Sequence, residues 1–434
     1  MDEKDSFDKR LAWKPKLSMK NVTNTLNEIG DFAQTAIDNT QGDINSTLGN
    51  AEECISTCGA SVDAVRIRVQ NRLIQYYTSV IEAITRNFLI PVDLVEYVYG
   101  ELKDELKKDI HPKIFHFENP WIIWGNAKCP TNPNEDCPYP ILTEIDPKEI
   151  QLKKDRDPYV FIHGMVYDAT KKDGSDFSRS EPTDAYGFYK TFEEEAKMFI
   201  NMPEEKRDKI DIYLVEYESE MTKKEEGIIR DYLIEHILLD LEPYEFLIIA
   251  AIFWKEMERR AKFTGDCILP FIEKLRDENQ GSVITHSLGG YVMAHAAHKI
   301  IDTKGFDDRK SIQKWWCLSP ALPSNAFTNT GDFEKAPFIA GPSRGEEIWG
   351  ATTVWYSLSD IALMLLYPLA TFHPAMGQTG IGIVETIGYV RDINITKTTC
   401  TTHGPGGAYI ARLGPCIRWF LRTNSDDDNC RLLN

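Results

Sequence analysis

No stretch of this sequence is apolar for long enough to cross a membrane, and the chain has no surplus of positive charge. A spanning helix needs roughly 18 or more apolar residues in a row. The longest apolar stretches cover only 246–254 and 361–372, and Pro368 interrupts the second. We therefore expect no transmembrane helix. The formal net charge is −18, and we expect no nucleic-acid partner, because binding phosphate requires clustered Lys and Arg.

The start of the chain lacks the features of a secretory leader. Residues 1–5 read MDEKD, and no apolar segment follows them, whereas a signal peptide contains one. The cytoplasm is therefore the default compartment, and export of a leaderless chain by a dedicated secretion system stays open. Peripheral membrane contact also stays open, since apolar surface alone can drive it.

Cysteine is sparse and shows no clear pairing pattern. The chain has nine Cys, an odd number, and in a reducing compartment free thiols are the default. Cys54 and Cys58 are four residues apart on an expected helix, where packing explains them. Cys129 and Cys137 bracket a loop rich in Pro and Asn. Whether these two pair stays open, and no second Cys/His pair lies close enough in sequence to suggest a metal site.

The residue composition and the spacing of apolar residues change twice along the chain. Residues 1–110 are predicted to form an N-terminal helical region, because apolar residues recur at three- and four-residue spacing within 62–85. Residues 111–156 are rich in Pro, Asn and Asp, which indicates a linker or cover with short edge strands. From 157 to 434, short apolar strands alternate with helices, a pattern typical of an α/β domain with a mostly parallel sheet.

Strands of this domain are expected at 159–163, 210–217, 282–285, 315–318, 352–357 and 387–395. Between the second and third of them, residues 221–262 form a long helical segment with an apolar centre. A minimal alternation of strands and helices does not need this segment. We therefore interpret it as an insertion that could form a lid.

The segment SVITHSLGG, residues 282–290, carries the strongest functional signal. An apolar strand enters it and an Ala-rich helix leaves it. A sharp turn between the two would hold the backbone of Ser287 in a strained conformation and present its hydroxyl at the end of the sheet. Gly289 and Gly290 would let the helix pass close to the strand. The first N–H groups of that helix would face any oxyanion formed there.

This pattern resembles the nucleophile elbow, G-x-S-x-G, of lipases and esterases in the α/β-hydrolase superfamily. Thr285 stands where the first Gly usually is, so the crossing there should be slightly looser. The resemblance covers about residues 157–410. It implies a sheet flanked by helices and a serine carboxylic ester hydrolase that needs no metal or organic cofactor. His-Ser-Leu-Gly-Gly is frequent among lipases and phospholipases, which implies an ester or lipid substrate.

A second segment is similar to the oxyanion loop of the same family. An apolar strand ends in His163 and Gly164, about 120 residues before the elbow. Gly164 would let the backbone approach the nucleophile. The resemblance then implies the N–H groups of Met165 and Leu288 as the two donors to the oxyanion.

A serine nucleophile needs a base, and in this family the chain order is Ser, acid, His. His403 lies in a Gly-rich loop after the last expected strand, where the family has its base. His373, in the loop between the last two expected strands, is the rival, and the choice stays open. His295 and His298 fall within the helix after the elbow, where we expect surface or packing roles.

Asp360 follows the expected strand 352–357, which is the strand end that supplies the acid in this family. An Asp in such a place is also a common helix cap, so its role depends on the order Ser287, Asp360, His403. Asp392 and Glu385 are the rivals.

The expected reaction is acyl transfer in two steps through an acyl-enzyme. A thioesterase, an amidase or an acyltransferase would use the same residues, and a non-catalytic binding module with this fold is a further alternative. The apolar stretches 246–254 and 361–369 would suit an acyl chain or the packed core. The N-terminal helices show no chemistry and are predicted to cap the domain or bind a protein partner.

Overall fold

The computed structural model describes residues 92–106, 111–124, 140–165, 183–200, 202–219, 224–225, 227–229, 231–232, 242–278, 281–305, 312–341, 351–358, 360, 362–363, 367–371, 373–381, 390–399, 403, 409–414 and 417. The chain divides into two compact units, one of Met1–Leu73 with Glu82–Phe88 and one of Ile74–Ile81 with Leu89–Asn434. Every described residue belongs to the second unit. The helices expected before residue 92 and the pairs Cys54/Cys58 and Cys129/Cys137 lie outside the described residues.

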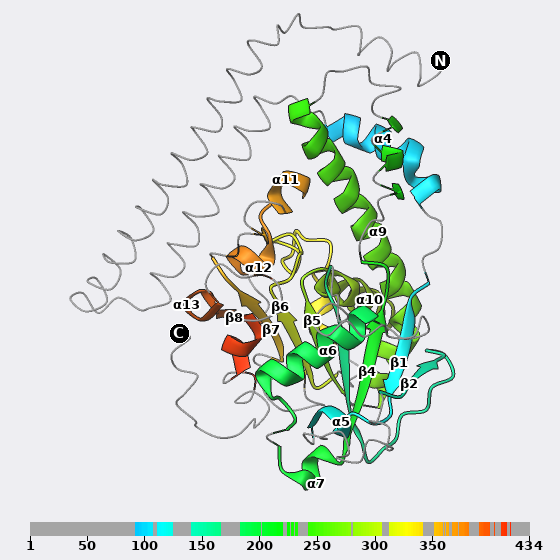
Figure 1. Cartoon of the computed structure of the whole chain (residues 1–434), viewed down its shortest axis with the longest axis vertical. Coiled ribbons are helices and arrows are strands. Elements are labelled where there is room, and N and C mark those ends of the chain that lie inside the picture. Colours follow the sequence, from blue (N-terminus) through cyan, green and yellow to red (C-terminus); the bar gives the residue numbers. More distant parts are fainter. Residues whose placement is uncertain are drawn as a thin grey trace, which may run out of the picture. The chain divides into compact units, whose positions relative to one another are not determined.

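A single eight-stranded sheet forms the centre of the second unit, in the order β2-β1-β4-β3-β5-β6-β7-β8 (Figure 1). The six strands from β4 to β8 in this order run parallel, while β1 is antiparallel to both β2 and β4. The strands are β1 (Lys113–Phe117), β2 (Leu142–Ile145), β3 (Asp157–Ile162), β4 (Ile210–Glu216), β5 (Ser282–His286), β6 (Lys314–Leu318), β7 (Thr352–Tyr356) and β8 (Val390–Asn394). These elements confirm the expected α/β class.

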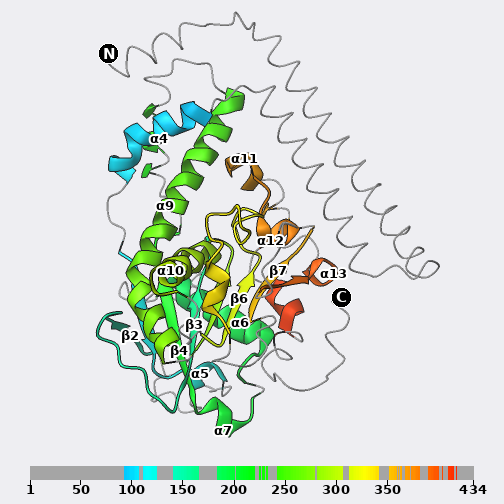
Figure 2. The ribbon, with the colours of Figure 1, turned by 180° about the vertical axis from the view of Figure 1, so that it is seen from behind.

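Helices cover both faces of this sheet. They are α4 (Val92–Leu106), α5 (Trp121–Trp124), α6 (Thr183–Ala196), α7 (Glu204–Arg207), α9 (Glu242–Asp277), α10 (Leu288–Lys304), α11 (Tyr367–Thr371), α12 (Met376–Thr379) and α13 (Thr396–Thr399), with a 3-10 turn η1 (Ala336–Ile339). Alternate strand residues face opposite sides. Val160 of β3 packs with α9 and α10, whereas Phe161 packs with α6. Figure 2 shows α9 and α10 in front of the sheet and α6 behind it.

Residues 111–156 contribute more to the fold than a linker or cover. They supply β1 and β2, and β1 lies inside the sheet between β2 and β4 rather than at its edge. The apolar run 121–124 is the short helix α5 and not a strand. The Pro- and Asn-rich residues between these elements dominate the composition of the segment and hide two strands of only five and four residues.

The long helix α9 continues further than the sequence indicates. It spans 36 residues to Asp277, well beyond 262, and its C-terminal part packs beside α10 as a layer of the domain. Near its N-terminal end, Ala251 and Ile252 are buried in a cluster with residues of α4. Among the described residues, no helix combines the length and the hydropathy that crossing a bilayer would require.

Candidate active site

Ser287 lies at the turn between β5 and α10, in a conformation that few non-glycine residues adopt. Its φ is 49° and its ψ is −119°, so the backbone is strained there. Contacts on both sides hold the turn in place. The Ser287 N–H donates to the carbonyl of Leu318 at 3.0 Å, and the Ser287 carbonyl accepts from the N–H groups of Gly290 and Ala321. The sharp turn expected at residue 287 is therefore present.

Two glycines allow the chain to approach this turn closely. A Cβ on Gly289 would overlap the carbonyl oxygen of Ile162, so α10 passes directly against the end of β3. A Cβ on Gly164 would lie 2.8 Å from the Cβ of Ser287. The His-Gly loop after β3 therefore lies against the serine, as the sequence predicts. The first N–H of α10, that of Leu288, has no acceptor within its own helix because of its position.

The position of Met165 follows from the same loop. It comes directly after Gly164, and its side chain packs against the core cluster that contains α9 and α10. Because it follows Gly164, which lies against Ser287, the main chain of residue 165 begins close to the serine in space, although the two are far apart in sequence. The residues that follow, 166–182, lie outside the described part of the chain.

Three side chains form a line of hydrogen bonds beyond the carboxyl ends of β5 and β7. His403 Nδ1 lies 2.7 Å from Asp360 Oδ2, and His403 Nε2 lies 2.9 Å from Ser287 Oγ. A carboxylate only accepts hydrogen bonds, so Nδ1 carries the proton and donates it to Asp360. Nε2 of the neutral ring is then the acceptor for the Ser287 hydroxyl. The serine proton therefore points at the atom that would remove it.

Asp360 is held from the other side. Its side chain is 0% exposed, and its Oδ1 accepts the N–H of Leu363 at 3.1 Å. The His403 side chain is 19% exposed, so the ring remains accessible from outside. A buried carboxylate behind a partly exposed imidazole stabilises the imidazolium that forms when His403 takes a proton.

His286, the residue before the serine, supports this arrangement and was not predicted from the sequence. Its Nε2–H donates to the main-chain carbonyl of His403 at 2.9 Å, and the two rings lie 5.0 Å apart. Burial lowers the pKa of His286 well below 6.5, and the neighbouring His403 lowers it further. The side chain is therefore neutral. Its place directly before the serine was the signal available in the sequence.

The rival residues lie elsewhere. His373 is exposed, and its main chain bonds to the hydroxyl of Thr371. Asp392, within β8, accepts the N–H of Ile381. Glu385 lies outside the described residues. The structure thus brings Ser287 together with His403 and Asp360 and not with His373 or Asp392.

The two histidines of α10 take packing and surface roles. His295 Nε2 lies 2.9 Å from Asp266 of α9, and the edge of His298 packs against the ring of Phe333. Thr285, which replaces the first glycine of the elbow pattern, is buried in β5 and accepts the indole N–H of Trp315 at 3.1 Å.

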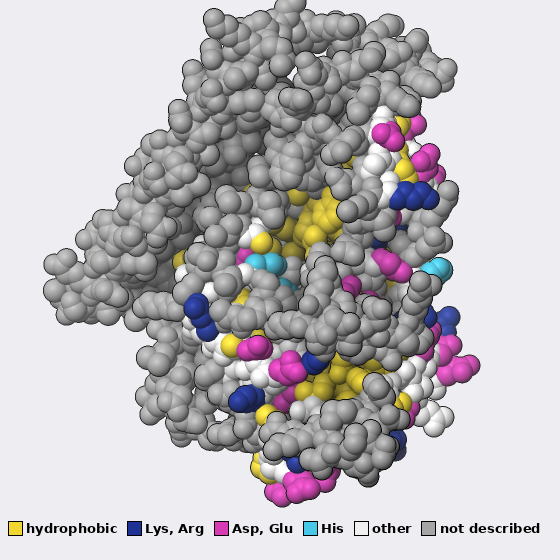
Figure 3. All heavy atoms as spheres, viewed as in Figure 1, with side chains coloured by type: hydrophobic (Ala, Val, Ile, Leu, Met, Phe, Trp, Pro, Cys, Tyr) yellow, Lys and Arg dark blue, Asp and Glu magenta, His cyan; other side chains and the backbone are white. Residues whose placement is uncertain are grey.

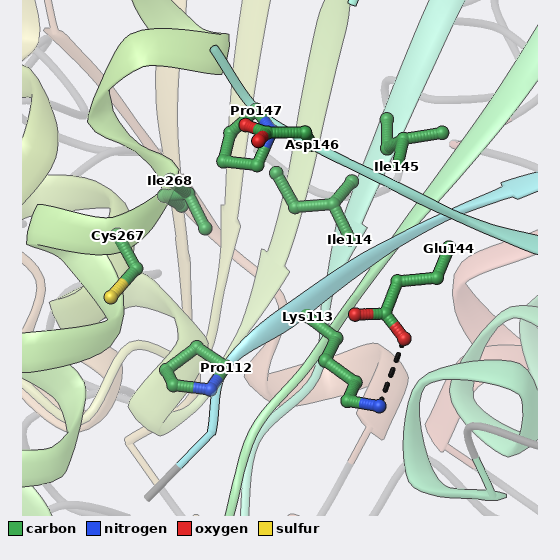
Figure 4. Close-up of a pocket in the computed structure, with 9 residues that line it drawn as sticks. All are labelled: Pro112, Lys113, Ile114, Glu144, Ile145, Asp146, Pro147, Cys267 and Ile268. Atoms are coloured by element: carbon green, nitrogen blue, oxygen red, sulfur yellow. Dashed lines mark hydrogen bonds and ion pairs between the residues drawn. The ribbon is translucent and has the colours of Figure 1, made fainter. Parts of the chain in front are cut away.

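A separate cavity of about 430 Å³ lies between α9 and the strands β1 and β2. Figure 4 shows its lining, in which Lys113 and Glu144 form an ion pair of 2.9 Å. Cys267 and Ile268 of α9 close one side. None of the three hydrogen-bonded residues at the serine lines this cavity, so it is distinct from the candidate active site.

The hydrogen-bonded serine, imidazole and carboxylate are the groups that nucleophilic acyl transfer requires. No protein-family model and no curated protein matches this chain, so the geometry of these side chains is the basis for assigning a function.

Proposed function

We propose that this chain is a serine carboxylic ester hydrolase with an α/β-hydrolase fold, similar to lipases and phospholipases. One observation carries the proposal: Asp360, His403 and Ser287 form a continuous line of hydrogen bonds at 2.7 and 2.9 Å. The serine at its end has a strained backbone at a strand–helix turn. Strain of this kind persists where surrounding structure enforces it, commonly at active sites.

In the first step, Ser287 Oγ attacks the carbonyl carbon of the ester while His403 Nε2 takes the hydroxyl proton. Asp360 keeps His403 in the required tautomer. The oxyanion of the tetrahedral intermediate accepts hydrogen bonds from the N–H groups of Leu288 and Met165. His403 then donates its proton to the leaving alcohol oxygen, the C–O bond breaks, and an acyl-enzyme remains.

In the second step, a water molecule attacks the acyl carbon and gives its proton to His403 Nε2. The tetrahedral intermediate collapses, the carboxylic acid leaves, and the proton returns to Ser287 Oγ. The N–H groups of Met165 and Leu288 act in both steps. None of these steps requires a metal or an organic cofactor.

Apolar surface near the serine supports a substrate with an acyl chain. Figure 3 shows apolar side chains gathered beside histidine side chains at the end of the sheet, between α9 and α11. Trp254 of α9 packs edge to face on Tyr367 of α11 at 4.9 Å. We propose that α11 and the adjoining part of α9 form the lid of an acyl-binding groove.

A fluorophosphonate probe tests the nucleophile. Such probes react with activated serines, so we expect the wild-type protein to be labelled and Ser287→Ala to remain unlabelled. Ser319→Ala is the matched control, since Ser319 directly follows the neighbouring strand β6 and bonds to Tyr409, and it should label normally. Absence of labelling in the folded wild-type protein would exclude an active serine hydrolase.

A series of p-nitrophenyl esters with acyl chains of increasing length then tests the proposal of a lipid substrate. We expect kcat/KM to rise from acetate toward medium or long acyl chains, because each buried methylene contributes about 0.8 kcal/mol. Highest activity on the acetate ester and none on long-chain esters would exclude a lipase and would still be consistent with an esterase.

A further inference from the structure

Three side chains able to bind a metal ion converge behind the loop that follows β3. His163 follows the end of β3, Asp184 lies in the first turn of α6, and Glu216 ends β4. One nitrogen or oxygen atom from each lies within 4.8 Å of the others. His163 is 0% exposed and the Glu216 side chain 21%, so this is a largely buried cluster drawn from three elements rather than a set of surface acids.

The hydrogen bond of His163 fixes which nitrogen faces the acids. Nδ1 lies 2.7 Å from the carbonyl oxygen of Gly164, which can only accept, so Nδ1 carries the proton. Burial lowers the pKa of His163 to about 4, and the neutral ring therefore presents a lone pair at Nε2. That atom faces Glu216 Oε1 at 4.0 Å, too far for a shared proton. An imidazole oriented by an Nδ1–H bond to a backbone carbonyl is a common form of metal ligand.

Two carboxylates, those of Asp184 and Glu216, lie close together in this cluster. Glu216 Oε2 accepts the N–H of Ala185 at 2.9 Å, which leaves Oε1 directed toward His163. Burial, together with the nearby charges of Asp184 and Glu218, raises the pKa of Glu216 to about 8, against the lowering effect of hydrogen bonds from the backbone of Ala185 and Asp184. A second carboxylate beside a buried first one is costly unless a proton or a cation is shared with them.

We propose that His163, Asp184 and Glu216 bind a divalent transition-metal ion of the Zn²⁺ type. One imidazole nitrogen and two carboxylate oxygens are a donor set that suits Zn²⁺, with a fourth position for water. Ligand bonds of about 2.0–2.2 Å place two donors on one ion at most about 4.4 Å apart. The cluster reaches this spacing through a small adjustment of side chains.

An ion at this place would tie the end of β3 to β4 and α6. The Tyr217 hydroxyl already donates to the carbonyl of His163 at 2.9 Å, and the two rings stack at 4.5 Å. Gly164, the next residue, lies against Ser287. The ion would therefore hold the proposed oxyanion loop in position. This consequence depends on the proposed function, whereas the metal site itself does not.

The test is a calorimetric titration of the full chain, prepared without a histidine tag and stripped with a chelator, with Zn²⁺ at neutral pH. We expect one ion per chain and a rise of the melting temperature on binding. Asp184→Asn and Glu216→Gln should each weaken binding at least about tenfold. Asp266→Asn is the matched control, because Asp266 pairs with His295 and Lys299 on the surface, and it should bind Zn²⁺ as the wild type does.

Ser287→Ala separates this proposal from the hydrolase proposal, since it should bind Zn²⁺ normally whether or not the chain is an enzyme. Melting curves in chelator identify any variant that fails to fold, and the half-buried Asp184 is the milder of the two substitutions. The metal site is overturned if the wild type takes up no ion. It is also overturned if folded Asp184→Asn and Glu216→Gln retain wild-type affinity for Zn²⁺.

Discussion

His403 is held by three contacts from two different parts of the chain. Its ring bonds to Asp360, which follows β7, and to Ser287, which follows β5, while its carbonyl accepts from His286. A side chain in a loop would otherwise lose rotational freedom at a cost of about 0.5–1.5 kcal/mol on binding its partners. The contact from His286 fixes the main chain beneath the imidazole, so His286 is a positioning residue.

Loss of the His286 contact should therefore slow the reaction without weakening substrate binding. We expect His286→Phe to lower kcat by about 10–100-fold with little change in KM. His286→Gln, whose amide N–H can reach the same carbonyl, should recover part of the loss. Steady-state kinetics on one p-nitrophenyl ester would measure both. Equal kcat in His286→Phe and the wild type would contradict a positioning role.

The turn at Ser287 depends on the close packing of α10 against the end of β3. Gly289 makes this approach, while Gly100, on the exposed side of α4, has nothing within 4 Å of an added Cβ. Gly289→Ala should lower the free energy of unfolding by about 1–3 kcal/mol. Gly100→Ala should instead raise it by about 0.5–1 kcal/mol through helix propensity. Chemical denaturation measures both free energies of unfolding. Equal stability of the two variants would contradict the claim that the close approach of α10 to β3 requires Gly289.

The turn after α6 depends on a buried carboxylate. Glu193 accepts the N–H groups of Phe199 and Ile200, and burial raises its pKa from 4.5 to about 7, against the lowering effect of these bonds. The folded state thus holds this proton more tightly than the unfolded state. Its contribution to stability is complete below about pH 4.5 and is lost as the pH rises to about 7.

Glu193→Gln removes this titration. The free energy of unfolding of the wild type minus that of Glu193→Gln should fall between pH 4.5 and 7 and level off above. Glu204→Gln, which changes an exposed acid of α7, should show no such trend. Denaturant titrations across this pH range measure the difference, and a difference that rises with pH would contradict the sign.

At the level of elements, the sequence predicts the parts whose pattern is local. The runs that became β3 to β7 are largely apolar, because strands buried on both faces need apolar residues on both sides. The elbow and the His-Gly turn are likewise local. The pairing of β1 with β4, the continuation of α9 to Asp277 and the contact from His286 to the loop of the base depend on residues far apart in the chain, which no local pattern reveals.

At the scale of the whole molecule, the net charge of −18 bears on the surfaces that the protein approaches. An acidic protein is repelled by an anionic membrane, and salt screens this repulsion. If the substrate is a lipid, hydrolysis of anionic vesicles should rise several-fold between about 0.01 and 0.15 M salt, over which the screening length falls from about 30 to 8 Å. Hydrolysis of zwitterionic vesicles should change little. A decline on anionic vesicles with salt would point to a basic patch that dominates the encounter.

Ser287 and His403, the base proposed to take its proton, are 116 residues apart in sequence. A ribosome therefore synthesises the elbow long before it synthesises the imidazole that activates it. Even if the earlier strands have already folded, a nascent chain carries an inert serine until residue 403 has left the exit tunnel and docked beside β5. The order of the residues along the polypeptide thus delays any hydrolytic activity during translation, with no inhibitor or pro-segment needed.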